Sequence, residues 1–259
     1  MKKRFGFLWL VAGLMAVQMN AAIAGLADTV ERIKPAVVLV GTFKSTNSPR
    51  FQLRGTGFFV EDGTRVVTNA HVLPDATGAS EGATLVIQRR TGPGEWEMRP
   101  VSVLGKDVAR DLAVLRLEGP GAAGASAISL GDSARVREGD DLAFTGFPIG
   151  GVLGFSPVTH RATVSSITAA ALPSPSAQRL SEQAIRGLRG GTFDIFQLDA
   201  TAYPGNSGGP LFHTETGELM GVVNMVLIKG TRESALSQPS GISYAIPSRY
   251  VKELLDKLR

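Results

Sequence analysis

Apolar residues along this chain gather in short runs separated by clusters of glycine, proline, asparagine and aspartate. Such runs, bounded by turn residues, are typical of β-strands, and no repeating helical pattern lies between them. The pattern predicts an all-β fold, a barrel or a sandwich. The expected strands are 36–43, 55–60, 65–69, 84–89, 98–104 and 112–117, followed by 141–146, 157–168, 194–199, 210–212, 218–225 and 241–246.

Helical spacing occurs near the two ends of the chain. Residues 26–34 place Leu26, Val30 and Ile33 on one face, and Pro35 ends the run. Residues 248–258 begin with Ser248 as an N-cap candidate, and their apolar positions again have helical spacing. We expect this last segment to dock as a terminal helix.

The first residues have the pattern of a secretory signal peptide. A basic start, 1–4, precedes an uncharged apolar run, 5–17, and Ala22-Ile23-Ala24 offers a cleavage site. The apolar run is too short to span a membrane. We therefore expect 1–24 to be removed and the product to be exported to the periplasm or secreted, with a retained anchor as the alternative.

The rest of the chain divides into two halves that share the same pattern of short apolar runs and turn residues. Small residues dominate 118–127, which predicts a connector, so we expect domains at 25–122 and 123–259. The segment 170–193 departs from the strand pattern, and its residues 178–189 allow a short amphipathic helix. A connection this long is functional or a plain solvated insertion, and the sequence leaves both open.

Charge and cysteine content narrow the function classes. Three of the 27 lysine and arginine residues lie in 1–24, so the remainder nearly balances the 23 acidic residues. This balance gives no case for nucleic acid or for an anionic membrane as a partner. The chain has no cysteine, so an exported product would fold without disulfides.

The most distinctive stretch is Ala202-Tyr203-Pro204-Gly205-Asn206-Ser207-Gly208-Gly209-Pro210. A serine that acts as a nucleophile needs a base for its proton and donors for the developing oxyanion. The same Gly-x-Ser-x-Gly motif also fits a glycine-rich turn or the nucleophile elbow of α/β-hydrolases. The elbow requires an acid and then a histidine after the serine. Only His213 follows Ser207, with no acid between them, which excludes that fold.

Upstream residues provide the other order, histidine, then aspartate, then serine. His71 lies in Thr68-Asn69-Ala70-His71-Val72, and Asp111 begins Asp111-Leu112-Ala113-Val114-Leu115. The order Asp111, His160, Ser207 would match subtilisin. It is disfavoured because His160 lies within a strand-like alternation and the chain lacks a βαβ pattern.

Taken together, these stretches resemble a trypsin-like serine protease domain of the HtrA/Deg type over residues 55–259. The matching pieces are Gly55-Thr56-Gly57-Phe58, the two stretches around His71 and Asp111, Leu130-Gly131-Asp132-Ser133, Gly146-Phe147-Pro148-Ile149-Gly150, Pro204–Pro210 and Tyr244-Ala245-Ile246-Pro247. The resemblance implies two six-stranded antiparallel β-barrels of the chymotrypsin type with a C-terminal helix. Members usually continue into a peptide-binding PDZ domain, and we expect this chain to lack one.

The resemblance also implies a mechanism and a set of roles. His71, Asp111 and Ser207 would form the catalytic triad, and the N–H groups of Gly205 and Ser207 the oxyanion hole. No cofactor or metal is required. His160 and His213 are expected to be structural, and the aspartates Asp107, Asp132 and Asp199 to lie in turns or at strand ends.

Asn206 replaces the aspartate with which digestive relatives bind a new N-terminal amine. Activation by such an amine is therefore not expected, and activity would depend on loop order. The segment 170–193 is our candidate for this control.

Three segments would wall the pocket for the residue before the scissile bond. The wall residues are Thr201, Ala202, Tyr203, Val223, Asn224, Val226 and Ile242. Most are small or apolar, which predicts cleavage after valine, alanine or isoleucine. The substrate is expected to add as a β-strand to 222–226.

We thus expect an exported serine endopeptidase that acts on unfolded or damaged proteins. The alternative is a catalytically silent relative that binds peptides or holds unfolded chains. Polypeptide substrates are the expected partners, without nucleic acid or stable membrane insertion. A homo-oligomer or a separate regulatory protein stays open.

Overall fold

The structure is a computed structural model, and it describes residues 25–74, 82–119, 126–148, 154–170, 193–224 and 241–259. Several sequence predictions fall outside these ranges. They are the signal peptide 1–24, the boundary at 122/123, the helix at 178–189 and the wall residue Val226.

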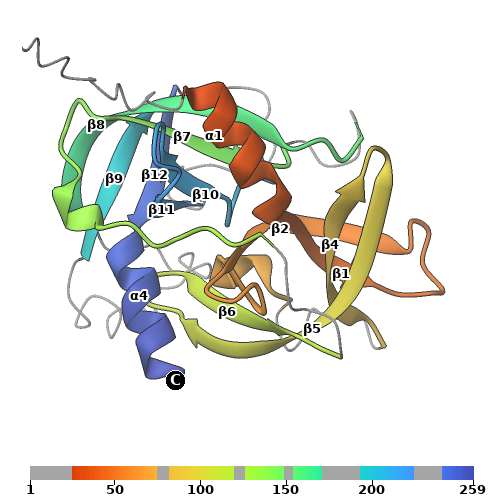
Figure 1. The fold of residues 1–259 in the computed structure, drawn as a ribbon. Coiled ribbons are helices and arrows are strands. Elements are labelled where there is room, and N and C mark those ends of the chain that lie inside the picture. The colour runs from red at the N-terminus through yellow and green to blue at the C-terminus, as the bar shows by residue number, and fades with distance from the viewer. Residues whose placement is uncertain (1–24, 75–81, 120–125, 149–153, 171–192, 225–240) are drawn as a thin grey trace, which may run out of the picture.

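The described residues form two closed barrels, in which all strand pairs are antiparallel (Figure 1). The first has the order β1-β2-β3-β6-β5-β4 and the second β10-β11-β12-β9-β8-β7. The strands of the first are β1 (Val37–Phe43), β2 (Phe51–Val60), β3 (Arg65–Thr68), β4 (Thr84–Gly92), β5 (Glu95–Asp107) and β6 (Leu112–Leu117). Those of the second are β7 (Asp141–Gly146), β8 (Val158–Ala170), β9 (Phe193–Asp199), β10 (Pro210–His213), β11 (Leu219–Asn224) and β12 (Ile242–Pro247).

The predicted fold class is confirmed, and each expected strand is present. Some strands extend beyond the predicted bounds, most clearly β5, which begins at Glu95 rather than residue 98. Its additional first residues, 95–97, pair with β4, and its additional last residues, 105–107, pair with β6. Apolar runs mark the buried part of a strand, whereas backbone pairing continues into positions outside those runs.

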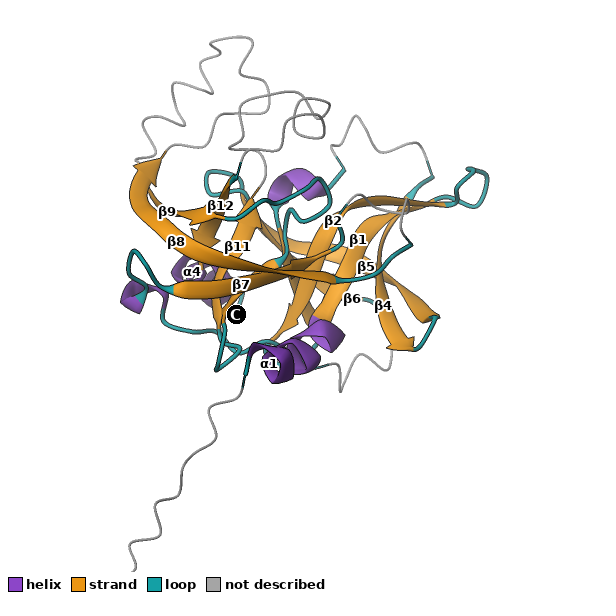
Figure 2. Cartoon of the chain, turned by 90° about the horizontal axis from the view of Figure 1, so that it is seen from above, coloured by secondary structure: helices purple, strands orange, loops and turns teal. Residues whose placement is uncertain are grey.

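The buried apolar residues form three clusters, one shared by the two barrels and one inside each barrel. Neighbouring residues of a strand can join different clusters because alternate side chains point to opposite faces. Phe58 joins a cluster shared by the two barrels, while its neighbour Phe59 points into the first barrel's own core. The shared cluster also contains Phe147 and Phe212 from the second half of the chain. Figure 2 shows the two sets of strands side by side. This shared core fixes the first barrel against the second.

Helix α1 (Leu26–Ile33) joins the start of the described chain to the second barrel. Its Thr29 hydroxyl donates to the carbonyl oxygen of Glu215, 3.0 Å away in the β10–β11 turn. Pro35 lies in a short 3₁₀ turn, η1 (Lys34–Ala36), and the chain then enters β1. The predicted helix is therefore present. It is hydrogen-bonded to the β10–β11 turn of the second barrel, and the chain after it forms the first barrel.

The terminal helix α4 (Ser248–Lys257) is also present, but Ser248 is not its N-cap. Pro247 occupies that position, and the Ser248 hydroxyl instead donates to the carbonyl oxygen of Gly131 at 2.9 Å. Ser248 is buried, so its hydroxyl is held by a tertiary partner rather than by the first helical turn. The capping prediction was wrong because sequence spacing carries no information about Gly131.

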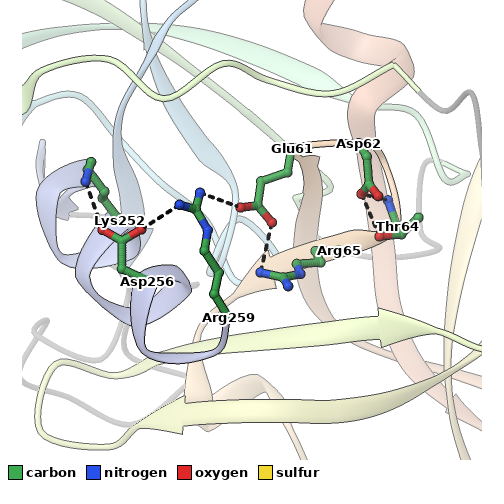
Figure 3. A network of polar contacts seen from close by, with 7 residues as sticks. All are labelled: Glu61, Asp62, Thr64, Arg65, Lys252, Asp256 and Arg259. Atoms are coloured by element: carbon green, nitrogen blue, oxygen red, sulfur yellow. Dashed lines mark hydrogen bonds and ion pairs between the residues drawn. The ribbon is translucent and has the colours of Figure 1, made fainter.

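Helix α4 contacts strands of both barrels, β5 and β6 in the first and β11 and β12 in the second. Figure 3 shows its end reaching the β2–β3 turn. Arg259 donates to Glu61 at 3.2 Å and also pairs with Asp256, and Glu61 in turn pairs with Arg65. Asp256 also binds Lys252. Lys252, Asp256 and Arg259 are exposed, and pairs between exposed groups typically add ~0–1 kcal/mol each.

Among the described residues, no helix is long and apolar enough to cross a membrane.

Candidate active site

Asp111 lies in the turn between β5 and β6 and has a left-handed backbone, with φ of 54°. Its carbonyl oxygen accepts hydrogen bonds from the Ala70 N–H at 3.1 Å and from the side-chain amide of Asn69 at 3.0 Å. The backbone N–H of His71 donates to Asp111 Oδ1 at 2.8 Å. The short helix η2 (Ala70–Val72) is therefore fastened to this turn by three hydrogen bonds.

The second carboxylate oxygen of Asp111 contacts the imidazole. Asp111 Oδ2 lies 2.5 Å from His71 Nδ1 and 2.8 Å from the side-chain nitrogen of Asn224. A carboxylate can only accept, so His71 Nδ1 carries a proton, and in the neutral imidazole Nε2 then keeps its lone pair. The carboxyl group is nearly buried, with Asp111 8% exposed. This arrangement orients the ring and leaves Nε2 as a base.

Asn224 belongs to β11, in the second barrel, and was predicted to line the substrate pocket. Its fully buried side chain donates to Asp111 instead. The pocket prediction for its side chain was therefore wrong. The sequence places Asn224 correctly on a strand beside the Ser207 loop, but only the packing of the two barrels directs its amide toward Asp111.

Ser207 follows a tight turn formed by Tyr203 to Asn206. The Asn206 N–H donates to the Tyr203 carbonyl oxygen at 2.9 Å, and Gly205 has φ of 105°. Proline second and a positive-φ glycine third are the marks of a type II turn. A Cβ on Gly205 would lie 2.1 Å from the Phe147 carbonyl oxygen. Position 205 therefore requires glycine for both conformation and space.

Thr56 of β2 ties this turn to the first barrel. Its hydroxyl donates to the Gly205 carbonyl oxygen at 2.6 Å and accepts from the Phe147 N–H at 3.1 Å. Its own N–H donates to the Ser207 carbonyl oxygen at 2.8 Å. The sequence analysis included Thr56 only as part of a glycine-flanked motif and assigned it no role. Its fixed position between two glycines was the available signal.

The amides of Gly205 and Ser207 lie on either side of Asn206. In the part of the chain that the structure describes, neither N–H donates to a protein acceptor. The Asn206 side chain is buried beside Gly146, and within the described ranges its amide has no hydrogen-bond partner. The turn thus places two available donors next to the serine.

Comparison with known proteins gives a family for this chain. The profile of the trypsin-like peptidase domain matches residues 55–222.

The chain belongs to the trypsin-like peptidase family.

Its relatives identify this peptidase domain as one of the HtrA type. It is 30% identical over 235 residues to the mitochondrial serine protease HTRA2 of Drosophila ananassae, covering 91% of this chain and 46% of that protein. It is 30% identical over 241 residues to serine protease HTRA3 of Rattus norvegicus, covering 90% and 45%. The chain spans somewhat less than half the length of these relatives.

A solved structure of the HtrA-type protease AlgW with a tripeptide has the same fold. Its TM-score is 0.61 at 25% identity, covering 90% of this chain and 63% of that one.

The predicted pocket walls are only partly exposed in this HtrA-type domain. Thr201 and Tyr203 are half-buried, and Ile242 is 42% exposed. Ala202 and Val223, however, are buried in the second barrel's own core. Their side chains face the barrel interior, so their assignment to the pocket wall was wrong.

The expected addition of a substrate strand to 222–226 also needs correction. The Val223 N–H donates to the Gly209 carbonyl oxygen, and the Val223 carbonyl accepts from the Gly208 N–H, both at 2.9 Å. On its other side Val223 pairs with β12. Both edges are occupied at Val223, so this residue cannot pair with an added strand.

His160 and His213 lie outside this site. His213 Nδ1 accepts from the N–H groups of Glu215 and Thr216 in its own turn. His160 stacks on Phe144, with 4.8 Å between ring centroids, and approaches Tyr203 at 6.4 Å. Its Nε2 is buried and, among the described residues, without a partner.

The other aspartates have local roles of the expected kind. Asp132 caps the short helix η3 (Ser133–Arg135) by accepting from the Ala134 N–H. Asp107 accepts from the Arg110 N–H in the turn that carries Asp111. Asp199 ends β9.

No group of three or more potential metal ligands occurs in the described ranges. A hollow of about 970 Å³ lies on the outer side of the second barrel, lined among others by Arg135, Arg161 and His213. It includes neither His71, Asp111 nor Ser207.

Thr56→Val should weaken both the fold and the turn from Tyr203 to Asn206. The variant leaves the Gly205 carbonyl oxygen and the Phe147 N–H without their buried partner, at a cost of ~1–3 kcal/mol for each unsatisfied group. We expect Thr56→Val to have a lower free energy of unfolding in urea than wild type. Its labelling at Ser207 by a fluorophosphonate should fall more than that of the control variant. Thr64→Val is the control, because the Thr64 hydroxyl bonds Asp62 at the surface. Equal effects of the two variants would contradict the assignment.

His160 should make folding stability depend on pH. Burial lowers the pKa of His160 below its usual value of 6.5, so the unfolded chain takes up the proton first. The contribution of neutral His160 is then fully present above pH 6.5 and lost as pH falls toward the folded-state pKa. His160→Phe keeps a ring against Phe144 and cannot be charged. Its free energy of unfolding should fall less between about pH 7 and 5 than that of wild type; parallel curves would refute this.

Proposed function

We propose that this chain is an exported serine endopeptidase that hydrolyses peptide bonds of unfolded or damaged proteins through His71, Asp111 and Ser207. The observation that carries the proposal is the Asp111 carboxylate. It accepts the His71 Nδ1–H and, from the other barrel, the Asn224 amide. Such a buried, fully bonded carboxylate beside a histidine is the arrangement that prepares an imidazole to act as a base.

In the proposed reaction, Ser207 Oγ attacks the carbonyl carbon of the scissile bond. His71 Nε2 accepts the hydroxyl proton and later returns it to the leaving amine. Asp111 holds the tautomer and stabilises the imidazolium formed on the way. Water then repeats the sequence on the acyl-enzyme, with His71 again the base, and releases the second product.

The Gly205 and Ser207 amides are the proposed oxyanion hole. The positive φ of Gly205 and the hydrogen bond from Thr56 to its carbonyl oxygen support this role. Donors that are held in place before reaction need no reorganisation as charge develops, and losing one typically costs ~10²–10³ in rate. This preorganisation favours the enzyme over the catalytically silent peptide binder.

Export is supported by the signal-peptide pattern of 1–24 and places the product in the periplasm or outside the cell. HTRA2 of Drosophila ananassae is a mitochondrial protease, so the location of this chain is proposed from its own N-terminal sequence. Unfolded polypeptides are the proposed substrates because productive binding needs an extended chain beside the residues after Val223.

Substitution of the triad tests the reaction. Ser207→Ala and His71→Ala should each lower peptide hydrolysis by several orders of magnitude while the thermal unfolding transition is retained, since the triad acts as a unit. A fluorophosphonate probe should label wild type at Ser207, and Ser156→Ala, at an exposed serine, should be labelled as wild type. A wild-type protein that is never labelled would instead be the peptide-binding relative.

The cleavage preference tests the pocket. Thr201 and Ile242 are the remaining small or aliphatic walls in the described residues, so cleavage sites in a denatured proteome should follow valine, alanine or isoleucine. Selectivity should be modest, because one methylene is worth ~1–3 kcal/mol. Ile242→Ala should shift the profile toward larger aliphatic residues, and Val103→Ala, which alters an equally exposed side chain on the first barrel, should not. Dominant cleavage after arginine, lysine or glutamate would rule out this pocket.

A further inference from the structure

The backbone of Asp111 is held in an unusual conformation. A positive φ is uncommon for residues other than glycine and persists only where surrounding contacts impose it. Asp107 closes the turn before it, because its carboxylate accepts from the Arg110 N–H and from the Arg110 guanidinium, both at 3.1 Å. The Asp111 N–H points back to Val108 in the same turn. Arg110 is thus the residue through which this turn is closed.

The guanidinium of Arg110 is held from outside the turn by helix α4. It lies 4.4 Å from the centroid of the Tyr250 ring, within range of a cation–π interaction. It also pairs with Glu253 at 3.0 Å. Tyr250 and Glu253 are three residues apart on one helix and present neighbouring side chains. Arg110 therefore links the turn to helix α4 in two ways, by its contact with the Tyr250 ring and by its ion pair with Glu253.

Tyr250 itself is anchored in the second barrel. Its ring packs edge-on against Phe193, with 5.6 Å between centroids, and its hydroxyl accepts from the Asp194 N–H at 3.1 Å. Arg249 also lies over the ring, at 4.8 Å, and pairs with Asp194. The ring is nearly buried. A single aromatic side chain therefore connects the start of β9, helix α4 and the turn that carries Asp111.

We propose that Arg110 is a positioning residue for catalysis, clamped by Tyr250 and Glu253 so that the Asp111 carboxylate stays aligned with His71. This inference rests on the proposed protease function. In the described residues, no contact joins the Arg110 guanidinium to the Asp111 carboxylate, so Arg110 acts through the backbone and not by neutralising the carboxylate. Asn224 of the second barrel holds the Asp111 carboxylate. The contacts of Arg110 with Tyr250 and Glu253, which we call the clamp, hold the backbone of the Asp111 turn.

Two matched substitutions separate positioning from general stability. Arg110→Met keeps the aliphatic part of the side chain but removes the guanidinium group. Arg249→Met removes the other guanidinium that lies over the Tyr250 ring. We expect Arg110→Met to lower kcat about tenfold with KM unchanged, less than the ~10²-fold that a 1 Å misplacement of reacting groups can cost. Arg249→Met should change kcat less than about twofold, since it does not touch the Asp111 turn. Arg110→Lys, which keeps the charge toward Glu253, should recover part of the loss.

The proton shared by His71 Nδ1 and Asp111 provides a readout that does not need activity. In proton NMR spectra it should give a far-downfield signal in wild type and in Arg249→Met. In Arg110→Met the signal should be broadened or lost through faster exchange with water. Should Arg110→Met fail to fold, Glu253→Gln removes only the ion pair at a half-exposed position and should give the same changes at smaller size.

The outcomes keep the two proposals apart. Equal behaviour of Arg110→Met and Arg249→Met, in both kcat and the NMR signal, would overturn the positioning role of Arg110. A wild-type protein that neither hydrolyses peptides nor reacts with a fluorophosphonate would overturn the protease function. In that case the NMR comparison alone still decides whether the clamp aligns Asp111 with His71.

Discussion

The hydrogen bonds that converge on the Asp111 carboxylate are the interaction on which the site depends. They come from both barrels, since His71 belongs to the first and Asn224 to the second. A nearly buried carboxylate is costly unless its oxygens are satisfied. The relative placement of the two barrels is therefore a condition for satisfying both oxygens of the Asp111 carboxylate.

The shared apolar core supplies that placement. Phe58, Phe147 and Phe212 are fully buried between the barrels and bring β2 against the chain that follows β7. Thr56 lies two residues before Phe58 on the same strand, so the packing that buries Phe58 also brings the Thr56 hydroxyl to the Gly205 carbonyl oxygen. Stability and catalytic geometry share these residues, because close packing leaves little freedom for one to change without the other.

Helix α4 adds a second link between the barrels at the rear of the site. Tyr250 is bonded to the start of β9, and Arg110 extends from the Asp111 turn across its ring. At its end, Arg259 reaches Glu61 near β3 (Figure 3). The buried contacts at Tyr250 have more effect than the exposed ion pairs at Arg259, because exposed charges are screened and must order long side chains.

Local sequence patterns were enough to predict the strands, both described helices and the family order of histidine, aspartate and serine. These features depend on local periodicity, on turn residues and on short motifs, and all of them are encoded within a few neighbouring positions. Only the tertiary structure decided which side chains meet. Asn224 turns to Asp111, Ser248 to Gly131 and Val223 into the barrel core. Thr56 joins the nucleophile turn across the interface of the barrels. Those partners are separated by about a hundred residues or lie on the inner face of a closed barrel, and strand periodicity distinguishes two faces without saying what each face will contact.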